Sequence, residues 1–378
     1  MARIFETLKS YKFRHFNIRL LIWVCALTVI GILAIASATD SDIYEKKQIM
    51  GFAMGLFIMV IACLVSYKFI LKFSWAFYFL NLILLIWVKV AGANKMGATR
   101  WIDLGFIQLQ PSEFTKIFLI LFFARYLCKY KDRLNTLPVI GGAVVLFAIP
   151  LALVLKQPDL STSIVISLTF CAIMYMAGLS YKIIGGVLAV AVPVAVVLIY
   201  LIMQPNQKII EEYQYNRIIG FYDENNEVAE RINYQQKNSV MAIGSGGLWG
   251  KGLNNNTTTS VKNGNYISEP QTDFIFCIVG EELGFVGASA VIILLLLIIL
   301  ECFYIGANAP DMAGKLIACG FGFLLAIQSF VNIGVVTRII PNTGLPLPFV
   351  SYGLSSLLSL FACIGVILNI GLQRKEII

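Results

Sequence analysis

The stretch "GASAVIILLLLIILECFYIGA", from Gly287 to Ala307, contains one charged residue, Glu301, among apolar, small and aromatic side chains. A run of this length crosses a hydrocarbon layer of roughly 30 Å as a helix, and it is too long for a strand of a membrane barrel. Similar runs recur along the chain, in which 58% of the 378 residues are hydrophobic and only 13% are charged. A water-soluble core cannot bury so much apolar surface. The sequence therefore predicts an all-α, polytopic integral membrane protein.

The apolar runs predict about ten transmembrane helices in a single membrane domain that covers residues 1–378. The N-terminal tail carries Arg3, Lys9, Lys12, Arg14 and Arg19, so the positive-inside rule places it in the cytoplasm. An even number of spans returns the C-terminus to the cytoplasm and leaves a long extracytoplasmic loop at 204–273. The predicted spans are 20–38, 49–66, 73–91, 112–127, 138–155, 159–179, 183–203, 283–306, 315–336 and 349–371.

Several classes of function are disfavoured by the residues that could carry them. The eight cysteines are scattered without a C-x-x-C pair, and the single histidine, His15, lies in the basic tail. Buried free thiols are therefore expected, and a histidine metal site or catalytic triad is unsupported. The segment "GSGGLWGKG", from Gly244 to Gly252, lacks the spacing of a phosphate-binding loop and is expected to form tight turns at the membrane surface. The net charge of +8 comes from Lys and Arg residues whose distribution over the loops indicates membrane topology, so no nucleic-acid partner is expected.

Charged side chains in or near the predicted outer loops are the candidates for chemistry. Glu113 and Lys116 stand three residues apart on one helix face, where they form either a structural ion pair or a cation oriented toward an anionic substrate. Asp159, which begins a predicted span, is either a helix N-cap or part of the site. The full set is Arg100, Asp103, Glu113, Lys116, Lys156, Asp159, Arg217, Arg231, Asp273, Glu281 and Glu282.

Asp273 differs from these residues because it ends the long polar loop and is followed directly by aromatic and apolar residues in "TDFIF". The aromatic side chains would hold the carboxylate at the membrane interface. Glu281 and Glu282 would lie about 12 Å further along a helix. We expect these two to be structural and bonded to neighbouring loop groups.

Five motifs over nearly the whole chain resemble the SEDS family of bacterial cell-wall polymerases, whose members include RodA, FtsW and SpoVE. The resemblance implies ten spans with both termini in the cytoplasm, which agrees with the count made from the apolar runs. The motifs are "GATRWIDLGFIQLQPSEFTK" (97–116), "KQPDLST" (156–162), "YQQKNSVMAIGSGGLWGKGL" (234–253), "EPQTDFIFCIVGEELGFVG" (269–287) and "NIGVVTRIIPNTGLPLPFVSYGLSSLL" (332–358).

The resemblance further implies a peptidoglycan glycosyltransferase that polymerises lipid II at the outer face of the cytoplasmic membrane, with Asp273 essential. Inverting transfer needs a base for the acceptor hydroxyl, whereas a diphosphate is already a good leaving group. The departing diphosphate would be neutralised by cations, for which Lys116, Arg100 and Arg217 are candidates, or by a bound Mg²⁺ or Mn²⁺. No organic cofactor is expected.

Asp103 in "RWIDLG" and Pro346 in "GLPLPF" are similar to the elongation-type RodA sequences within the family. Two positions depart from the family pattern. Arg338 stands where many members have glycine, and Leu354 replaces the second glycine of "SYGGSS". These departures concern the subtype and the local backbone.

Two other functions stay open at this point. A lipid II flippase would bind the same lipid but should carry charges through the middle of several spans, and the predicted spans here are nearly all apolar. A non-catalytic scaffold for a penicillin-binding protein would make Asp273 dispensable. A class B penicillin-binding protein is an expected partner in either case, because the chain has no acyl-transfer constellation with which to cross-link glycan. The eighth and ninth predicted spans offer the faces on which its helix would pack.

Overall fold

The structure is a computed structural model that describes residues 16–39, 41–95, 98–103, 108–157, 159–204, 210, 215, 217, 221, 227–254, 260 and 266–373. The basic tail used to orient the chain and much of the predicted 204–273 loop lie outside these residues, as does the side chain of Arg231.

Each of the ten predicted spans coincides with a helix of the structure. These helices are α2 (Ile18–Ala38), α3 (Asp42–Leu64), α5 (Ser74–Ala91), α6 (Pro111–Lys129), α7 (Leu137–Leu155), α8 (Leu160–Met176), α9 (Tyr181–Ile202), α13 (Gly284–Ala307), α14 (Met312–Val336) and α15 (Leu354–Leu372). Shorter elements are α4 (Tyr67–Lys72), η2 (Lys131–Arg133), α11 (Glu227–Ser245) and α12 (Ile275–Glu282).

Seven of the described helices are long and apolar enough to cross a membrane: α2, α3, α7, α9, α13, α14 and α15. Helices α5 and α8 have apolar stretches of fewer than 18 residues, Ser74–Val90 and Leu160–Met176. Helix α6 carries the charged residues Glu113 and Lys116 near its N-terminus. The all-α membrane architecture is therefore confirmed, and the count of ten crossings stays a prediction.

Polar caps and prolines set where several helices begin. Asn17, Ser41, Asp159 and Asp311 each accept a backbone N–H in the first turn of α2, α3, α8 and α14. Helix α6 begins at Pro111, whose missing N–H costs nothing at a first helical position.

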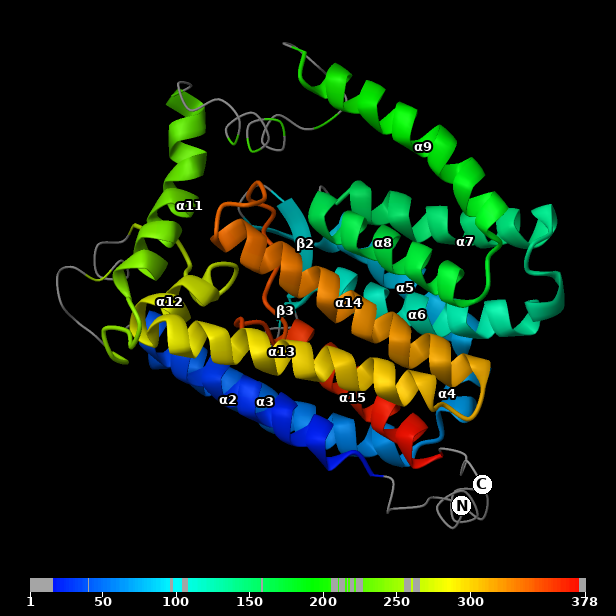
Figure 1. Cartoon of the computed structure of the whole chain (residues 1–378), viewed down its shortest axis with the longest axis horizontal. Coiled ribbons are helices and arrows are strands. Elements are labelled where there is room, and N and C mark those ends of the chain that lie inside the picture. Colours follow the sequence, from blue (N-terminus) through cyan, green and yellow to red (C-terminus); the bar gives the residue numbers. More distant parts are fainter. Residues whose placement is uncertain are drawn as a thin grey trace.

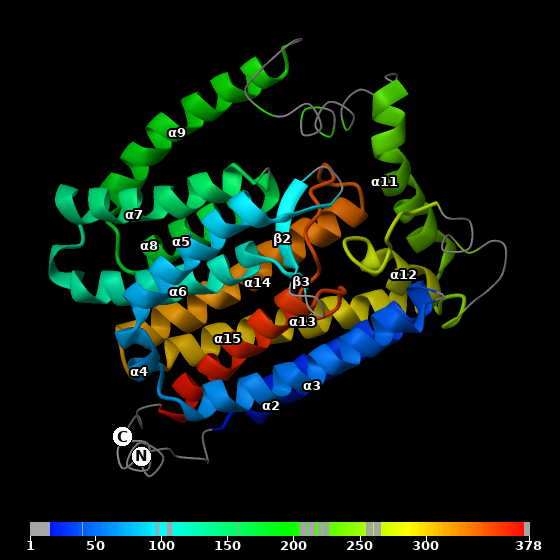
Figure 2. The ribbon, with the colours of Figure 1, turned by 180° about the vertical axis from the view of Figure 1, so that it is seen from behind.

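The helices run alongside one another, with α11 and α12 at one end of the bundle (Figure 1). Helix α2 begins and helix α15 ends at the opposite end of the bundle (Figure 1). Helices α14 and α15 form the centre, since most of their residues are buried, whereas α9 has no buried residue and stands away from the others (Figure 2).

A small antiparallel sheet was not predicted. It consists of β1 (Ala93–Lys95), β2 (Ala98–Asp103) and β3 (Gln108–Leu109) in the order β1-β2-β3, between α5 and α6. Strand β2 carries Arg100 and Asp103. The sheet is attached to α15 because Ser355 Oγ donates to the carbonyl of Gln108 and accepts from the Gln110 N–H.

The break between α12 and α13 was also not predicted. Gly284 has a φ of 64°, in the left-handed region, and a Cβ there would lie 2.3 Å from the Gly250 nitrogen. The glycine-rich segment predicted to turn at the membrane surface thus packs directly against this break, where the Gly252 N–H donates to the Glu282 carbonyl. Only glycines allow the two backbones to approach so closely.

Candidate active site

Asp273 lies two residues before α12 and is partly accessible. The N-cap of α12 is Phe274, and no side chain accepts a hydrogen bond at this helix start. The Asp273 carboxylate is therefore not used as a helix cap. Its backbone carbonyl accepts a hydrogen bond of 2.8 Å from Asn332 Nδ2, which connects the residue to α14.

A left-handed glycine brings a cation next to this carboxylate. Gly344, with a φ of 72°, is placed so that a Cβ on it would be 3.3 Å from Asp273 Oδ2 and 3.7 Å from Arg217 Nη1. The carboxylate and the guanidinium therefore both border the space beside Gly344, a residue that has no side chain. Any larger residue at position 344 would compete for this space.

Burial raises the pKa of Asp273 to about 6, well above the ordinary value of 3.8. The positive charges of Arg217 and Arg100 lower this pKa, while the negative charges of Glu269 and Asp159 raise it. Three candidates predicted from distant parts of the sequence, Arg217, Arg100 and Asp159, thus act on one carboxylate together with Glu269, which was not predicted. A base with a pKa near 6 is ionised at neutral pH and still has appreciable basicity.

Arg100 and Asp159 are held by the segment between α7 and α8. Arg100 Nε donates to the carbonyl of Gln157 at 3.1 Å, and Gln157 Nε2 donates to the Leu85 carbonyl at 3.0 Å. Asp159 Oδ1 accepts the Thr162 N–H at 3.1 Å, which confirms the N-cap interpretation. Its negative charge also raises the pKa of Asp273, and its predicted role in the site stays a prediction.

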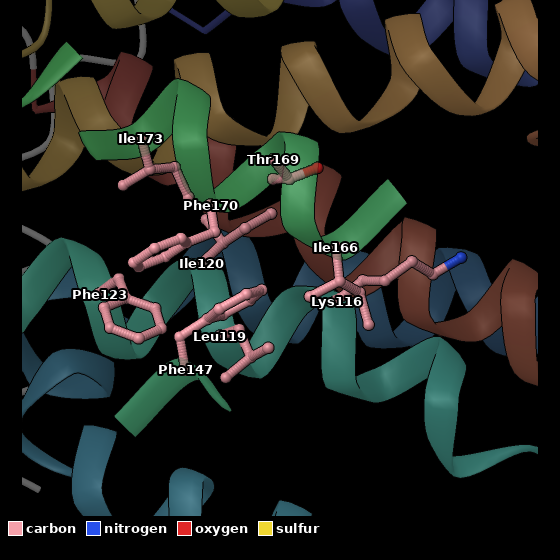
Figure 3. Close-up of a pocket in the computed structure, with 9 residues that line it drawn as sticks. All are labelled: Lys116, Leu119, Ile120, Phe123, Phe147, Ile166, Thr169, Phe170 and Ile173. Carbon is pink, nitrogen blue, oxygen red and sulfur yellow. The ribbon is translucent and has the colours of Figure 1, made fainter. Parts of the chain in front are cut away.

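Glu113 and Lys116 form an ion pair of 2.8 Å whose side chains are each 2% exposed. Lys116 Nζ also donates to Gln328 Oε1 at 2.9 Å. Lys116 lies at one end of a narrow cavity between α6, α7 and α8, and its ammonium points away from the aromatic residues that line the remainder (Figure 3). The geometry contains a buried ion pair that fits both roles predicted from the sequence, the structural one and the substrate-facing one.

Glu281 and Glu282 are buried away from Asp273, on α12. Glu281 accepts a hydrogen bond of 2.7 Å from Lys251 Nζ, and its carbonyl accepts the Lys251 N–H. The predicted attachment to neighbouring loop groups is therefore confirmed for the Glu281 side chain, whereas Glu282 is attached through its backbone carbonyl, which accepts the Gly252 N–H. Arg338 stands where many family members have glycine. Its φ of 58° lies in the left-handed region, which glycine adopts without strain.

Sequence reasoning missed the amides Gln328 and Asn332 of α14 and the conformation of Gly344. Two amides four residues apart in an otherwise apolar span were the available signal, because a buried amide needs partners. Among the described residues, no three or more His, Cys, Asp or Glu side chains lie together in a way suited to a metal ion.

Residues 15–376 match the model of the FtsW/RodA/SpoVE family, described as "Cell cycle protein". The chain belongs to this family. Among the relatives of this FtsW/RodA/SpoVE protein, the peptidoglycan glycosyltransferase MrdB of Escherichia coli (strain K12) is 36% identical over 362 residues, which cover 96% of this chain and 95% of MrdB. The family and the apolar helices identify a multi-pass protein of the bacterial cytoplasmic membrane.

Two solved structures share the fold over nearly all of both chains. One, from a study titled "Structural coordination of polymerization and crosslinking by a peptidoglycan synthase complex", has a TM-score of 0.76 and 25% identity, and covers 94% of this chain and 97% of its own. The other is the rod shape determining protein RodA of Thermus thermophilus, with a TM-score of 0.68, 25% identity and coverages of 97% and 98%. These comparisons confirm the resemblance to the SEDS family. One of the similar structures is a RodA protein.

Proposed function

We propose that Asp273 is the catalytic base of this peptidoglycan glycosyltransferase and that lipid II is its donor. The observation that carries the proposal is the partly accessible carboxylate beside Arg217 and Arg100, with its pKa raised to about 6. A carboxylate that titrates below neutrality is ionised when it meets an acceptor hydroxyl. The surrounding cations suit a diphosphate donor.

In the proposed step, Asp273 takes the proton of the acceptor's 4-hydroxyl group as its oxygen attacks the anomeric carbon of the donor. The bond from that carbon to the phosphate oxygen breaks, and the diphosphate leaves with the electron pair, so the anomeric configuration inverts. Arg100 and Arg217 would stabilise the negative charge that develops on the leaving group. No paired general acid is required, because the diphosphate leaves without protonation.

A divalent cation remains part of the proposal. Mg²⁺ commonly binds one or two carboxylates together with substrate phosphates and several waters. Asp159, whose Oδ2 lies 3.5 Å from Ser112 Oγ, is a carboxylate of this site that could contribute. When bound, the ion would neutralise diphosphate charge. Chelation followed by addition of Mg²⁺ or Mn²⁺ tests this, and full polymerisation in excess chelator would remove the ion from the mechanism.

The test of the catalytic proposal is polymerisation of labelled lipid II by purified protein, with and without a penicillin-binding protein. Asp273→Asn keeps the size of the side chain and should form no polymer. Asp42→Asn is a matched control, because Asp42 is an exposed carboxylate that pairs with the exposed Lys46. Polymer formation by Asp273→Asn at the control's rate would reject Asp273 as the catalytic base.

We also propose that a class B penicillin-binding protein packs its transmembrane helix on α13. The similar solved chain comes from a peptidoglycan synthase complex that coordinates polymerization and crosslinking, which supports a cross-linking partner. Helix α13 presents exposed apolar side chains at helical spacing, including Phe285, Ile292, Leu296 and Leu300, whereas α14 is largely buried. The ninth predicted span, α14, therefore has less exposed apolar surface for a partner helix than the eighth, α13.

A photo-crosslinking amino acid at Leu296 should capture the partner in cells. The matched control is Phe79 of α5, which is exposed to a similar degree on another helix. Capture at Phe79 and none at Leu296 would show that the docking face is wrong.

A further inference from the structure

Helix α14 presents two amide side chains toward two consecutive carbonyls of the loop that follows it. Gln328 Nε2 donates to the Pro346 carbonyl at 3.0 Å, and Asn332 Nδ2 donates to the Leu345 carbonyl at 2.6 Å. Residues four apart on a helix share one face, so both amides approach the loop from the same side.

Each amide also reaches a second group on the side of the proposed site. Asn332 Nδ2 donates to the backbone carbonyl of Asp273, and Gln328 Oε1 accepts from Lys116 Nζ. The loop segment 344–346 is therefore connected through one side chain to the proposed base and through the other to the buried cation. Gly344, the first residue of this segment, lies against the Asp273 carboxylate itself.

Packing alone does not account for these amides. Gln328 is 0% and Asn332 1% exposed, and the Asn332 Oδ1 atom has no hydrogen-bond partner. A buried acceptor without a partner is costly, so an apolar residue would be favoured here if only volume mattered. What Asn332 supplies is its donor, which joins the backbones of residues 273 and 345.

We propose that Asn332 and Gln328 are positioning residues, which hold segment 344–346 as a common support for Asp273 and Lys116. The inference rests on the proposed role of Asp273 as base. In this arrangement Asn332 holds the Asp273 backbone against Leu345, next to Gly344, where a Cβ would lie 3.3 Å from Asp273 Oδ2 and 3.7 Å from Arg217 Nη1. The other charged groups acting on the carboxylate are Arg100, Glu269 and Asp159.

The first test is Asn332→Leu, which preserves volume and removes the donor. A displacement of about 1 Å in a reacting group can lower a rate by as much as a hundredfold, so kcat for polymerisation should fall about ten- to hundredfold. The acidic limb of the pH–rate profile should move to higher pH, because Arg217, which lowers the Asp273 pKa, would be held less closely. Gln328→Leu should shift the limb in the same direction.

The matched control is Asn369→Leu in α15. Asn369 is also a buried asparagine bonded to backbone, since it accepts from the Tyr67 N–H and donates to the Cys63 carbonyl. These contacts lie toward the end of the bundle where α15 ends. This variant should lose stability, measured by thermal unfolding, but keep the wild-type pH–rate limb and kcat per folded molecule.

Gly344→Ala provides a second approach if Asn332→Leu does not fold. Its added Cβ would lie 3.3 Å from Asp273 Oδ2 and displace the carboxylate from the loop side. The proposal predicts the same alkaline shift of the limb in this variant. A wild-type limb and kcat in the folded variants would overturn it. If the positioning variants behave like the wild type while Asp273→Asn is inactive, only the positioning role is rejected. If Asp273→Asn is active, the role of Asp273 as base is rejected.

Discussion

Replacing Lys116 by methionine removes one charge of a buried pair and retains most of the side chain's volume. Glu113 and Lys116 are each 2% exposed, and Glu113 Oε2 has no hydrogen-bond partner, so the remaining carboxylate would lose the cation with which it is paired. Breaking a buried pair on one side typically costs about 3–5 kcal/mol. We expect a loss of that size in the free energy of unfolding of Lys116→Met, measured in mixed micelles with an increasing fraction of denaturing detergent.

The double variant Glu113→Gln/Lys116→Met separates the two interpretations of the pair. Removing both charges removes the orphaned carboxylate, so the unfolding free energy should return to within about 2 kcal/mol of the wild type. If the pair is only structural, lipid II polymerisation returns with stability. If Lys116 neutralises diphosphate, the double variant is stable and still poorly active.

The exposed pair Asp42–Lys46 is the matched control for this prediction. Its atoms are 3.4 Å apart, and its side chains are 76% and 75% exposed. Lys46→Met should change the unfolding free energy by less than about 1 kcal/mol, as is usual for surface pairs. Equal stability of Lys116→Met and Lys46→Met would refute the reasoning from burial.

Three further predictions concern the site and its support. The wild-type rate should rise with pH through about 6 and level above it, because Asp273 acts as a base only when ionised; a rate that is flat between about pH 5 and 7 would contradict this assignment. Arg217→Gln should move this limb to higher pH, since the guanidinium lowers the Asp273 pKa, and an unmoved limb would show that the pair is not coupled. Gly250→Val should prevent α12 from packing on the glycine-rich segment, because a Cβ at this position would lie 2.1 Å from the Glu282 carbonyl oxygen; a wild-type unfolding midpoint would show that the backbones separate freely.

The sequence by itself determined that the protein lies in a membrane, where its helices are, and which family it resembles. Hydrophobic runs such as Gly287–Ala307 can be satisfied only in lipid or in a helix bundle, so the ten helical ranges followed from local composition. The conspicuous position of Asp273, between a polar loop and a span, was likewise visible in the sequence. Its proposed catalytic role came from the family resemblance, since position alone would fit an ordinary interfacial carboxylate.

Only the tertiary structure decided which charged residues share a site. Asp273, Arg217, Arg100 and Asp159 come from four separated segments, and their mutual distances depend on helix packing and on the left-handed turn at Gly344. The raised pKa of Asp273 has the same origin, because desolvation depends on every group that surrounds the carboxylate. Hydrogen bonds across long sequence separations, such as that from Asn332 to the Asp273 carbonyl, leave no periodic signal in the chain.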